Sequence, residues 1–181
     1  MSSAAFDSPH NASRELRFKR TLAFLQATLP APARLLDLGP DNPLAERLRG
    51  LGYEVANTGL TDLDDHPEAV TGIQADAVTA FEILEHLVSP MPVLRALEPK
   101  RLFTSVPLRL WFATAYRNPA DRWDQHYHEF EDWQFDWLLE KGGWTTVRAE
   151  KWTSPTALTG VRPIMRRFTP RYYVVESRRT V

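Results

Sequence analysis

Apolar and polar residues along this chain follow two kinds of repeat, and the two repeats alternate. Short runs rich in β-branched and aromatic residues are typical of strands, whereas apolar residues that recur every three or four positions are typical of helices. Strands that alternate with helices predict an α/β fold, with a parallel or mixed sheet covered by helices on both faces. The predicted strands are 33–38, 53–57, 77–81, 102–106, 144–152 and 171–177, and the predicted helices are 13–30, 42–50, 91–97 and 132–140.

The starts of three predicted helices carry residues that favour capping. Asn42 followed by Pro43 is a strong start signal, because asparagine accepts hydrogen bonds from first-turn N–H groups and proline lacks the N–H that would be left unpaired. We expect Ser13 and Asp132 to cap the helices that follow them. The whole chain is expected to be one domain (residues 1–181), with an N-terminal helical segment at 1–30 and a sheet core at 33–178.

Two long stretches show no periodicity. Residues 58–74 are irregular and acidic, whereas residues 108–129 are rich in aromatic side chains, among them Trp111, Tyr116 and Trp123. A structureless connection of this length is uncommon in a compact domain unless it has a function. We therefore expect residues 108–129 to form a substrate loop or lid.

Composition and charge exclude several classes of protein. The 181 residues are 43% hydrophobic and 25% charged, which is ordinary for a soluble globular domain. The net charge of −1 does not favour DNA, RNA or an acidic membrane surface as the main partner. The absence of cysteine excludes disulfides, thiolate metal sites and a cysteine nucleophile. Because neither an apolar leader nor a run of about 18 apolar residues is present, we expect a cytoplasmic protein with no membrane partner.

The strand at 77–81 runs directly into a cluster of ionisable residues, Glu82, Glu85 and His86. If a helical turn begins here, this spacing brings the three side chains onto one face. The carboxyl end of a parallel strand is also where open α/β sheets bind their ligands. Two carboxylates and an imidazole could hold Mg²⁺, Mn²⁺ or Zn²⁺. The alternative is that the glutamates cap and the histidine packs locally.

Several segments together resemble the class I S-adenosylmethionine-dependent methyltransferases. They are LLDLG at 35–39, ADAVTAFEILEHL at 75–87, the proline-ended TSVP at 104–107, and HEFEDWQFDWLLEKGGW at 128–144. Within this class the chain looks most like the small-molecule methyltransferases that include ubiquinone-type O-methyltransferases. The resemblance implies a Rossmann-like, mostly parallel sheet of seven strands with one antiparallel edge strand. It also implies transfer of a methyl group from S-adenosyl-L-methionine, and we expect an oxygen of a small molecule as acceptor.

The resemblance also assigns residues to the cofactor, although the chain departs from the family pattern. Of three glycines at alternate positions only Gly39 is present, with Asp41 and Pro43 in the other two places. Gly59 stands where an acidic residue normally binds the ribose, and Asp62 is the nearest substitute. These departures keep open a second hypothesis, a methyltransferase-like domain without catalysis that acts as a binding module. The expected cofactor residues are Asp37, Gly39, Asp41, Gly59, Asp62, Phe81 and Glu82.

Methyl transfer from a sulfonium requires mainly alignment, and a base or a metal is needed only when the acceptor must lose a proton. Three histidines are candidates for that base, His86, His126 and His128, since an unperturbed imidazole has a pKa of about 6.5. Some relatives hold a metal with the pattern E-x-x-E-H and a later histidine. Here that implies Glu82, Glu85 and His86, with His126 or His128 completing the set. A metal-assisted RNA methyltransferase is therefore a third hypothesis.

Arginines gather near the C-terminus, at positions 162, 166, 167, 171, 178 and 179. Such a group could bind an acidic substrate or an RNA backbone. Because the chain as a whole is balanced in charge, we favour a solvated face.

Overall fold

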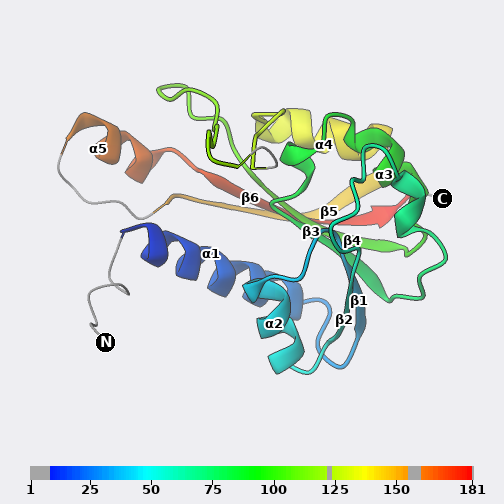
Figure 1. The fold of residues 1–181 in the computed structure, drawn as a ribbon. Coiled ribbons are helices and arrows are strands. Elements are labelled where there is room, and N and C mark those ends of the chain that lie inside the picture. The colour runs from blue at the N-terminus through cyan, green and yellow to red at the C-terminus, as the bar shows by residue number, and fades with distance from the viewer. Residues whose placement is uncertain (1–8, 122–123, 155–159, 181) are drawn as a thin grey trace.

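A computed structural model describes residues 9–121, 124–154 and 160–180 of the chain. The described residues form one sheet with the strand order β2-β1-β3-β4-β6-β5 (Figure 1). Its strands are β1 (Arg34–Asp37), β2 (Glu54–Asn57), β3 (Ala77–Phe81), β4 (Arg101–Pro107), β5 (Trp144–Trp152) and β6 (Tyr172–Arg179).

Parallel pairing joins β2, β1, β3 and β4, whereas β6 runs antiparallel to both β4 and β5. The predicted fold class, a mostly parallel Rossmann-like α/β sheet with one antiparallel strand, is confirmed. Two details differ from the expectation. The reversed strand lies next to the outermost strand rather than outermost, and the described residues supply six strands rather than seven. Residues 58–74 contain turns and a short 3₁₀ helix, η2 (Pro67–Val70), where a further strand would lie.

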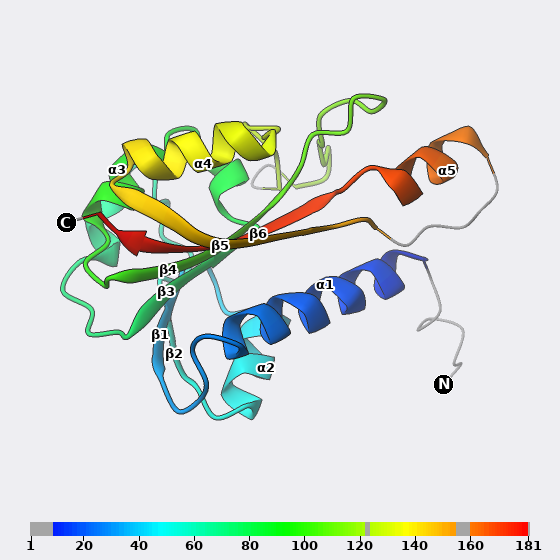
Figure 2. The ribbon, with the colours of Figure 1, turned by 180° about the vertical axis from the view of Figure 1, so that it is seen from behind.

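Helices cover both faces of the sheet, as the sequence predicts (Figures 1 and 2). One face carries α1 (Pro9–Gln26) and α2 (Pro43–Gly50), and the other carries α3 (Pro90–Ala96) and α4 (Asp132–Lys141). A helix that the sequence analysis missed, α5 (Val161–Phe168), lies beyond the ends of β5 and β6. Among the described helices, none is both long enough and apolar enough to cross a membrane.

The core has two layers, one on each face of the sheet. Phe24 of α1 packs with Leu35 of β1 in the layer under α1 and α2, whereas Leu36 packs in the layer under α3 and α4 with Phe135. Successive residues of a strand point to opposite faces, so a strand buried on both faces is mostly apolar. Leu35 and Leu36 of β1 follow this rule, and the polar exceptions, Asp37 and Thr79, are buried but hydrogen-bond to each other.

The predicted cap of α2 is confirmed, but that of α1 is wrong. The Asn42 side chain accepts hydrogen bonds from two first-turn N–H groups of α2. Ser13 instead lies inside α1, which begins four residues earlier at Pro9. Its hydroxyl hydrogen-bonds to Ser154 at 2.9 Å and to Tyr172 at 3.1 Å. The hydroxyl therefore attaches α1 to the sheet instead of capping it.

The cap of α4 lies one residue before the predicted one. Glu131 is the capping residue, and its backbone N–H donates to the Gln134 side chain at 3.0 Å. Asp132 instead forms an ion pair with Lys151 of β5. The prediction was wrong because two adjacent acidic residues both suit a helix start, and the contact with β5 decides between them.

Candidate functional site

The candidate site lies at the carboxyl ends of β1, β3 and β4. The chain passes from β1 outward to β2 and then returns to the other side of β1 to form β3. Such a switch point leaves a crevice where α/β sheets bind ligands. Two clefts open here, the first of about 310 Å³ and the second of about 600 Å³. They adjoin, because Arg17 and Glu82 line both.

The first cleft lies between the turn after β1, the turn after β3 and one side of α1. Three of the expected cofactor residues belong to it, since Asp37, Phe81 and Glu82 line its wall. Gly39 shapes the turn after β1. Its φ is +94°, and an added Cβ would lie 3.0 Å from Cδ1 of Ile83, so this position favours glycine for two reasons. The other lining residues include Arg14, Arg17, Phe18, Pro40, Asn42 and Ser105.

Asp37 holds this region together. Its carboxylate is buried and accepts hydrogen bonds from Thr79 Oγ1 at 2.6 Å, Asn57 Nδ2 at 3.0 Å and Asn42 Nδ2 at 3.2 Å. Burial raises the pKa of Asp37 to about 6, although these hydrogen bonds oppose the rise. The side chain therefore links β1 with β2, β3 and the start of α2.

Gly39 does not itself line the first cleft, and neither do three other expected cofactor residues. Asp41 is exposed and forms an ion pair with Arg49 at 2.8 Å. Gly59 donates its N–H to the Gly39 carbonyl at 3.1 Å, so it contacts the turn after β1 and does not line the cleft. Asp62 accepts a hydrogen bond from the backbone of its own loop. The structure thus brings none of the three to the cleft wall.

Glu82 separates the two clefts. One carboxylate oxygen accepts from Ser105 Oγ at 2.9 Å, and the other accepts from Arg17 Nη1 at 2.6 Å. Its φ of +57° is unusual for a residue with a side chain and turns the chain sharply after β3. The sequence analysis missed Arg17, because only the packing of α1 on the sheet brings this arginine to Glu82.

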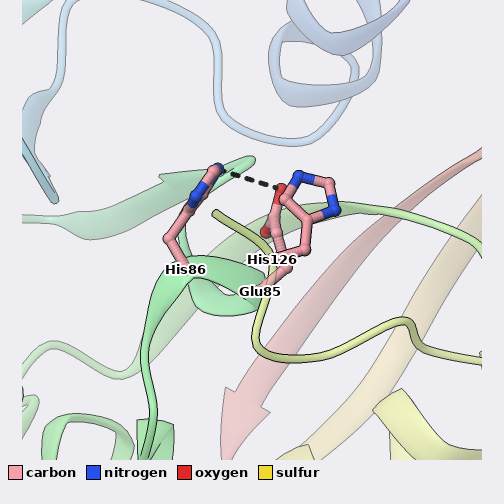
Figure 3. Close-up of side chains that lie close together, drawn as sticks. All are labelled: Glu85, His86 and His126. Carbon is pink, nitrogen blue, oxygen red and sulfur yellow. Dashed lines mark ion pairs between the residues drawn. The ribbon is translucent and has the colours of Figure 1, made fainter. Parts of the chain in front are cut away.

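Three side chains meet in the wall of the second cleft, Glu85, His86 and His126 (Figure 3). One ligand atom from each lies within 4.8 Å of the other two. His86 Nε2 lies 3.9 Å from Glu85 Oε1, and the two imidazole rings stand nearly perpendicular with centroids 4.9 Å apart. The Glu85 carboxylate is fully buried, and neither oxygen has a hydrogen-bond partner among the described residues. Burial, together with the Glu82 charge, raises the pKa of Glu85 well above 4.5.

Hydrogen bonds hold both imidazoles in the same tautomer. His86 Nδ1 lies 2.9 Å from the Gln125 carbonyl oxygen, which only accepts, so Nδ1 carries the proton. His126 Nδ1 lies 3.1 Å from a carboxylate oxygen of Glu129 and donates likewise. When it is neutral, each ring therefore has its lone pair at Nε2. Burial and the nearby His126 ring also lower the pKa of His86.

His128 and Glu82 are not part of this cluster. His128 stacks on Phe130 and its Nε2 lies 3.2 Å from the Val88 carbonyl, so it lines neither cleft. Glu82 is bonded to Arg17 and Ser105. Of the metal set predicted from the sequence, Glu85, His86 and His126 come together, whereas Glu82 and His128 lie outside the cluster.

The long loop at 108–129 contributes Tyr116, Asp124 and His126 to the lining of the second cleft. Trp123 of that loop lies outside the described residues. Arg166 and Arg171 also line this cleft, whereas Arg178 and Arg179 lie at the far end of β6. Arg166 and Arg171 therefore do not form one patch with Arg178 and Arg179.

Comparisons with known proteins identify the fold of this chain. The chain matches no model of a known protein family, and a search of characterised proteins finds no relative. Among solved structures it is similar to a 1,6-didemethyltoxoflavin-N1-methyltransferase from Burkholderia thailandensis, at 20% identity and a TM-score of 0.63, covering 98% of this chain and 87% of the other. That enzyme was crystallised with bound 1,6-didemethyltoxoflavin and S-adenosylhomocysteine.

Two further structures extend this comparison. One is an S-adenosylmethionine-dependent methyltransferase from Listeria monocytogenes described as putative, at 16% identity, a TM-score of 0.59, and coverage of 92% and 100%. The other is the cyclase SpnF, at 14% identity, a TM-score of 0.59, and coverage of 97% and 86%. The chain therefore has the Rossmann-like fold of class I methyltransferases, a fold that also supports other chemistry.

Proposed function

We propose that this chain transfers a methyl group from S-adenosyl-L-methionine to an oxygen of a small-molecule acceptor. The observation that carries the proposal is the pair of adjoining clefts at the switch point of the sheet, which share Arg17 and Glu82. Methyl transfer needs two ligands held end to end, and two clefts with a common wall meet that need.

The first cleft suits the charged end of the cofactor. Its volume of about 310 Å³ lies at the lower end of the range for ligand sites. Carboxylates at Asp37 and Glu82 suit the ammonium and sulfonium groups, and guanidinium groups at Arg14 and Arg17 suit the carboxylate. Phe81 adds an apolar wall. Gly59 and Asp62 do not line the cleft, so we assign neither residue a contact with the ribose.

The second cleft is proposed to hold the acceptor. When bound, the cofactor supplies an electrophilic methyl group, and the acceptor hydroxyl must lose its proton. His86 is placed to receive that proton at Nε2, because its Nδ1 already donates to Gln125. The presence of this base favours oxygen as the methylated atom. A small-molecule acceptor is in keeping with the toxoflavin-type substrate bound by the Burkholderia enzyme.

Calorimetry with S-adenosylmethionine and S-adenosylhomocysteine tests the first half of the proposal. We expect saturable binding at one site, weakened at least tenfold by Arg17→Met and unchanged by His128→Ala, which lies outside both clefts. Absence of binding at millimolar ligand in the folded protein would contradict the proposal. That outcome would favour the binding module that the sequence analysis left open.

A screen of hydroxyl-bearing acceptors tests the second half. With any acceptor found, His86→Ala should lower kcat at least tenfold while leaving the affinity for S-adenosylhomocysteine unchanged, because His86 lines only the second cleft. An unchanged kcat for His86→Ala would remove the assignment of the base.

A further inference from the structure

We propose that the acceptor in the second cleft carries an anionic group, a carboxylate or a phosphate, and that Arg166 of α5 binds this group. The assignment rests on the proposed function, because it takes the second cleft as the acceptor site. The charges that line this cleft, their partners and the placement of α5 support it.

Three arginines line the second cleft, and two of them are already paired within the protein. Arg17 donates a hydrogen bond to Glu82 at 2.6 Å. Arg171 donates to a backbone carbonyl at 2.6 Å, and the same nitrogen lies 3.6 Å from a carboxylate oxygen of Glu129. Arg166 is exposed and has neither a hydrogen bond nor an ion pair with any described residue. Its guanidinium group is therefore free to bind a ligand in the cleft.

The carboxyl groups that line the same cleft do not pair with Arg166. Glu82 is bonded to Arg17, and Asp124 accepts hydrogen bonds from two neighbouring side chains at 2.7 Å and 2.9 Å. Burial raises the pKa of Glu85 well above 4.5, which favours the uncharged form of that side chain. Arg166 therefore gives the cleft a positive charge that is not paired with any described carboxylate.

The orientation of α5 brings an arginine to the cleft and leaves apolar side chains in solvent. The helix lies beyond the ends of β5 and β6 (Figure 1). Val161 and Phe168 are 73% and 77% exposed, and Ile164 is 48% exposed. A helix that packs for stability alone turns its apolar side toward the protein. Because Arg166 lines the cleft instead, we attribute this orientation to ligand binding.

The cleft combines the two groups that a hydroxylated acid requires. Its volume of about 600 Å³ lies within the range of sites for small molecules. His86 is the proposed base for the hydroxyl, and Arg166 lines the same cleft. A guanidinium group binds carboxylates and phosphates through two parallel hydrogen bonds. The acceptor class is therefore a small hydroxyl compound with a carboxylate or a phosphate.

The experiment is calorimetry with matched acid and amide probes, with the chain alone and with S-adenosylhomocysteine present. The probes are para-hydroxyphenylacetate and the longer para-hydroxyphenylpropionate, each compared with its primary amide, which keeps the hydroxyl but lacks the charge. We expect the wild-type chain to bind at least one acid about fivefold to tenfold more tightly than its amide, because hydrogen bonds between charged groups are stronger than neutral ones. Para-hydroxybenzylphosphonate takes the place of a phosphate, and whichever anion binds more tightly identifies the group.

Variants of α5 assign the preference to one side chain. Arg166→Gln should abolish the preference for the acid, and Arg166→Lys should keep part of it, because lysine retains the charge but not the paired hydrogen bonds. Arg167→Gln is the matched control, since Arg167 is the next residue of α5, is exposed and lines neither cleft. It should keep the full preference. Affinity for the amides should be the same in all three variants, which a loss of folding would not allow.

Failure of this assignment is distinct from failure of the proposed methyl transfer. Equal affinity of the wild-type chain for acids and amides, or no binding of any probe at millimolar concentration, would overturn the anionic acceptor. An unchanged preference in folded Arg166→Gln would overturn the role of Arg166. Methylation of neutral hydroxyl compounds without any preference for acids would overturn the anionic acceptor and leave the proposed function intact. A preference for acids in a chain that does not bind S-adenosylmethionine would support Arg166 as an anion site and remove the methyl transfer.

Discussion

At the scale of single residues, two glycines beside the first cleft differ in what an added methyl group would meet. Gly39 has φ of +94° and Ile83 only 3.0 Å from a built Cβ, whereas Gly59 has φ of +75° and open space. The left-handed backbone costs an alanine about 1–2 kcal/mol, and contact with Ile83 adds to this at Gly39 alone. We expect Gly39→Ala to lower the free energy of unfolding by about 2–3 kcal/mol and Gly59→Ala by about 1 kcal/mol in urea denaturation. Equal losses would show that the Ile83 contact relaxes freely.

The buried carboxyl of Asp37 should give the chain a pH-dependent stability. Its pKa rises from 3.8 to about 6 in the folded protein. Between these values the folded state keeps a proton that the unfolded chain has lost, so stability is full below pH 3.8 and falls as pH rises to about 6. A pKa difference of this size corresponds to about 3 kcal/mol. Relative to Asp37→Asn, wild-type chain should lose roughly that much between pH 4 and pH 7 in denaturant unfolding.

The control for this prediction is Asp65→Asn, which changes an exposed aspartate. It should reproduce the wild-type pH profile. If Asp37→Asn and wild-type chain keep a constant difference across this pH range, the carboxyl titrates normally and the buried network around it is not as described.

The individual residues of the site divide into those that a sequence can reveal and those that it cannot. Phe81, Glu82, Glu85 and His86 were predictable, because the strand that positions them directly precedes or contains them. The sequence left open which of His126 and His128 meets Glu85. That choice depends on hydrogen bonds between a long loop and the turn η3 (Leu84–His86), and no local pattern encodes such contacts between distant segments.

At the scale of elements, α1 is attached to the sheet by side chains that also build the clefts. Arg17 and Glu82 form an ion pair at 2.6 Å with side-chain exposures of 26% and 15%. Loss of one partner leaves the other charge poorly compensated, so partly buried pairs couple more strongly than exposed ones. We expect a double-mutant cycle of Arg17→Met and Glu82→Gln to give a coupling energy of about 1–2 kcal/mol. The exposed pair Arg47–Glu15 provides the comparison and should give less than about 0.5 kcal/mol.

Elements with strong periodicity were predicted well, and those whose ends depend on tertiary contacts were not. The sequence predicted β3 and β5 with the bounds that the structure has. It missed α5, because it considered the arginines of this segment only as a charged group. The helical signal is present in the sequence, since the apolar residues Val161, Ile164, Met165 and Phe168 follow the spacing of one helix face.

At the scale of the whole molecule, ligand binding should stabilise the fold, because the first cleft draws its walls from α1, β1, β3 and β4 together. A ligand that binds only the folded state at a hundred times its Kd adds about 2.7 kcal/mol. For a chain of this length each kcal/mol raises Tm by roughly 2–4 °C. Saturating S-adenosylhomocysteine should therefore raise Tm by roughly 5–11 °C in thermal unfolding followed by circular dichroism.

The dependence of that shift on ligand and variant locates the binding site. Adenosine lacks the charged end that suits Arg14, Arg17 and Glu82, so it should raise Tm much less at equal concentration. Arg17→Met should lose most of the shift with S-adenosylhomocysteine, whereas His128→Ala should keep it. A full shift in Arg17→Met would place the ligand outside the first cleft, because no ligand held by that wall can be indifferent to the loss of its guanidinium group.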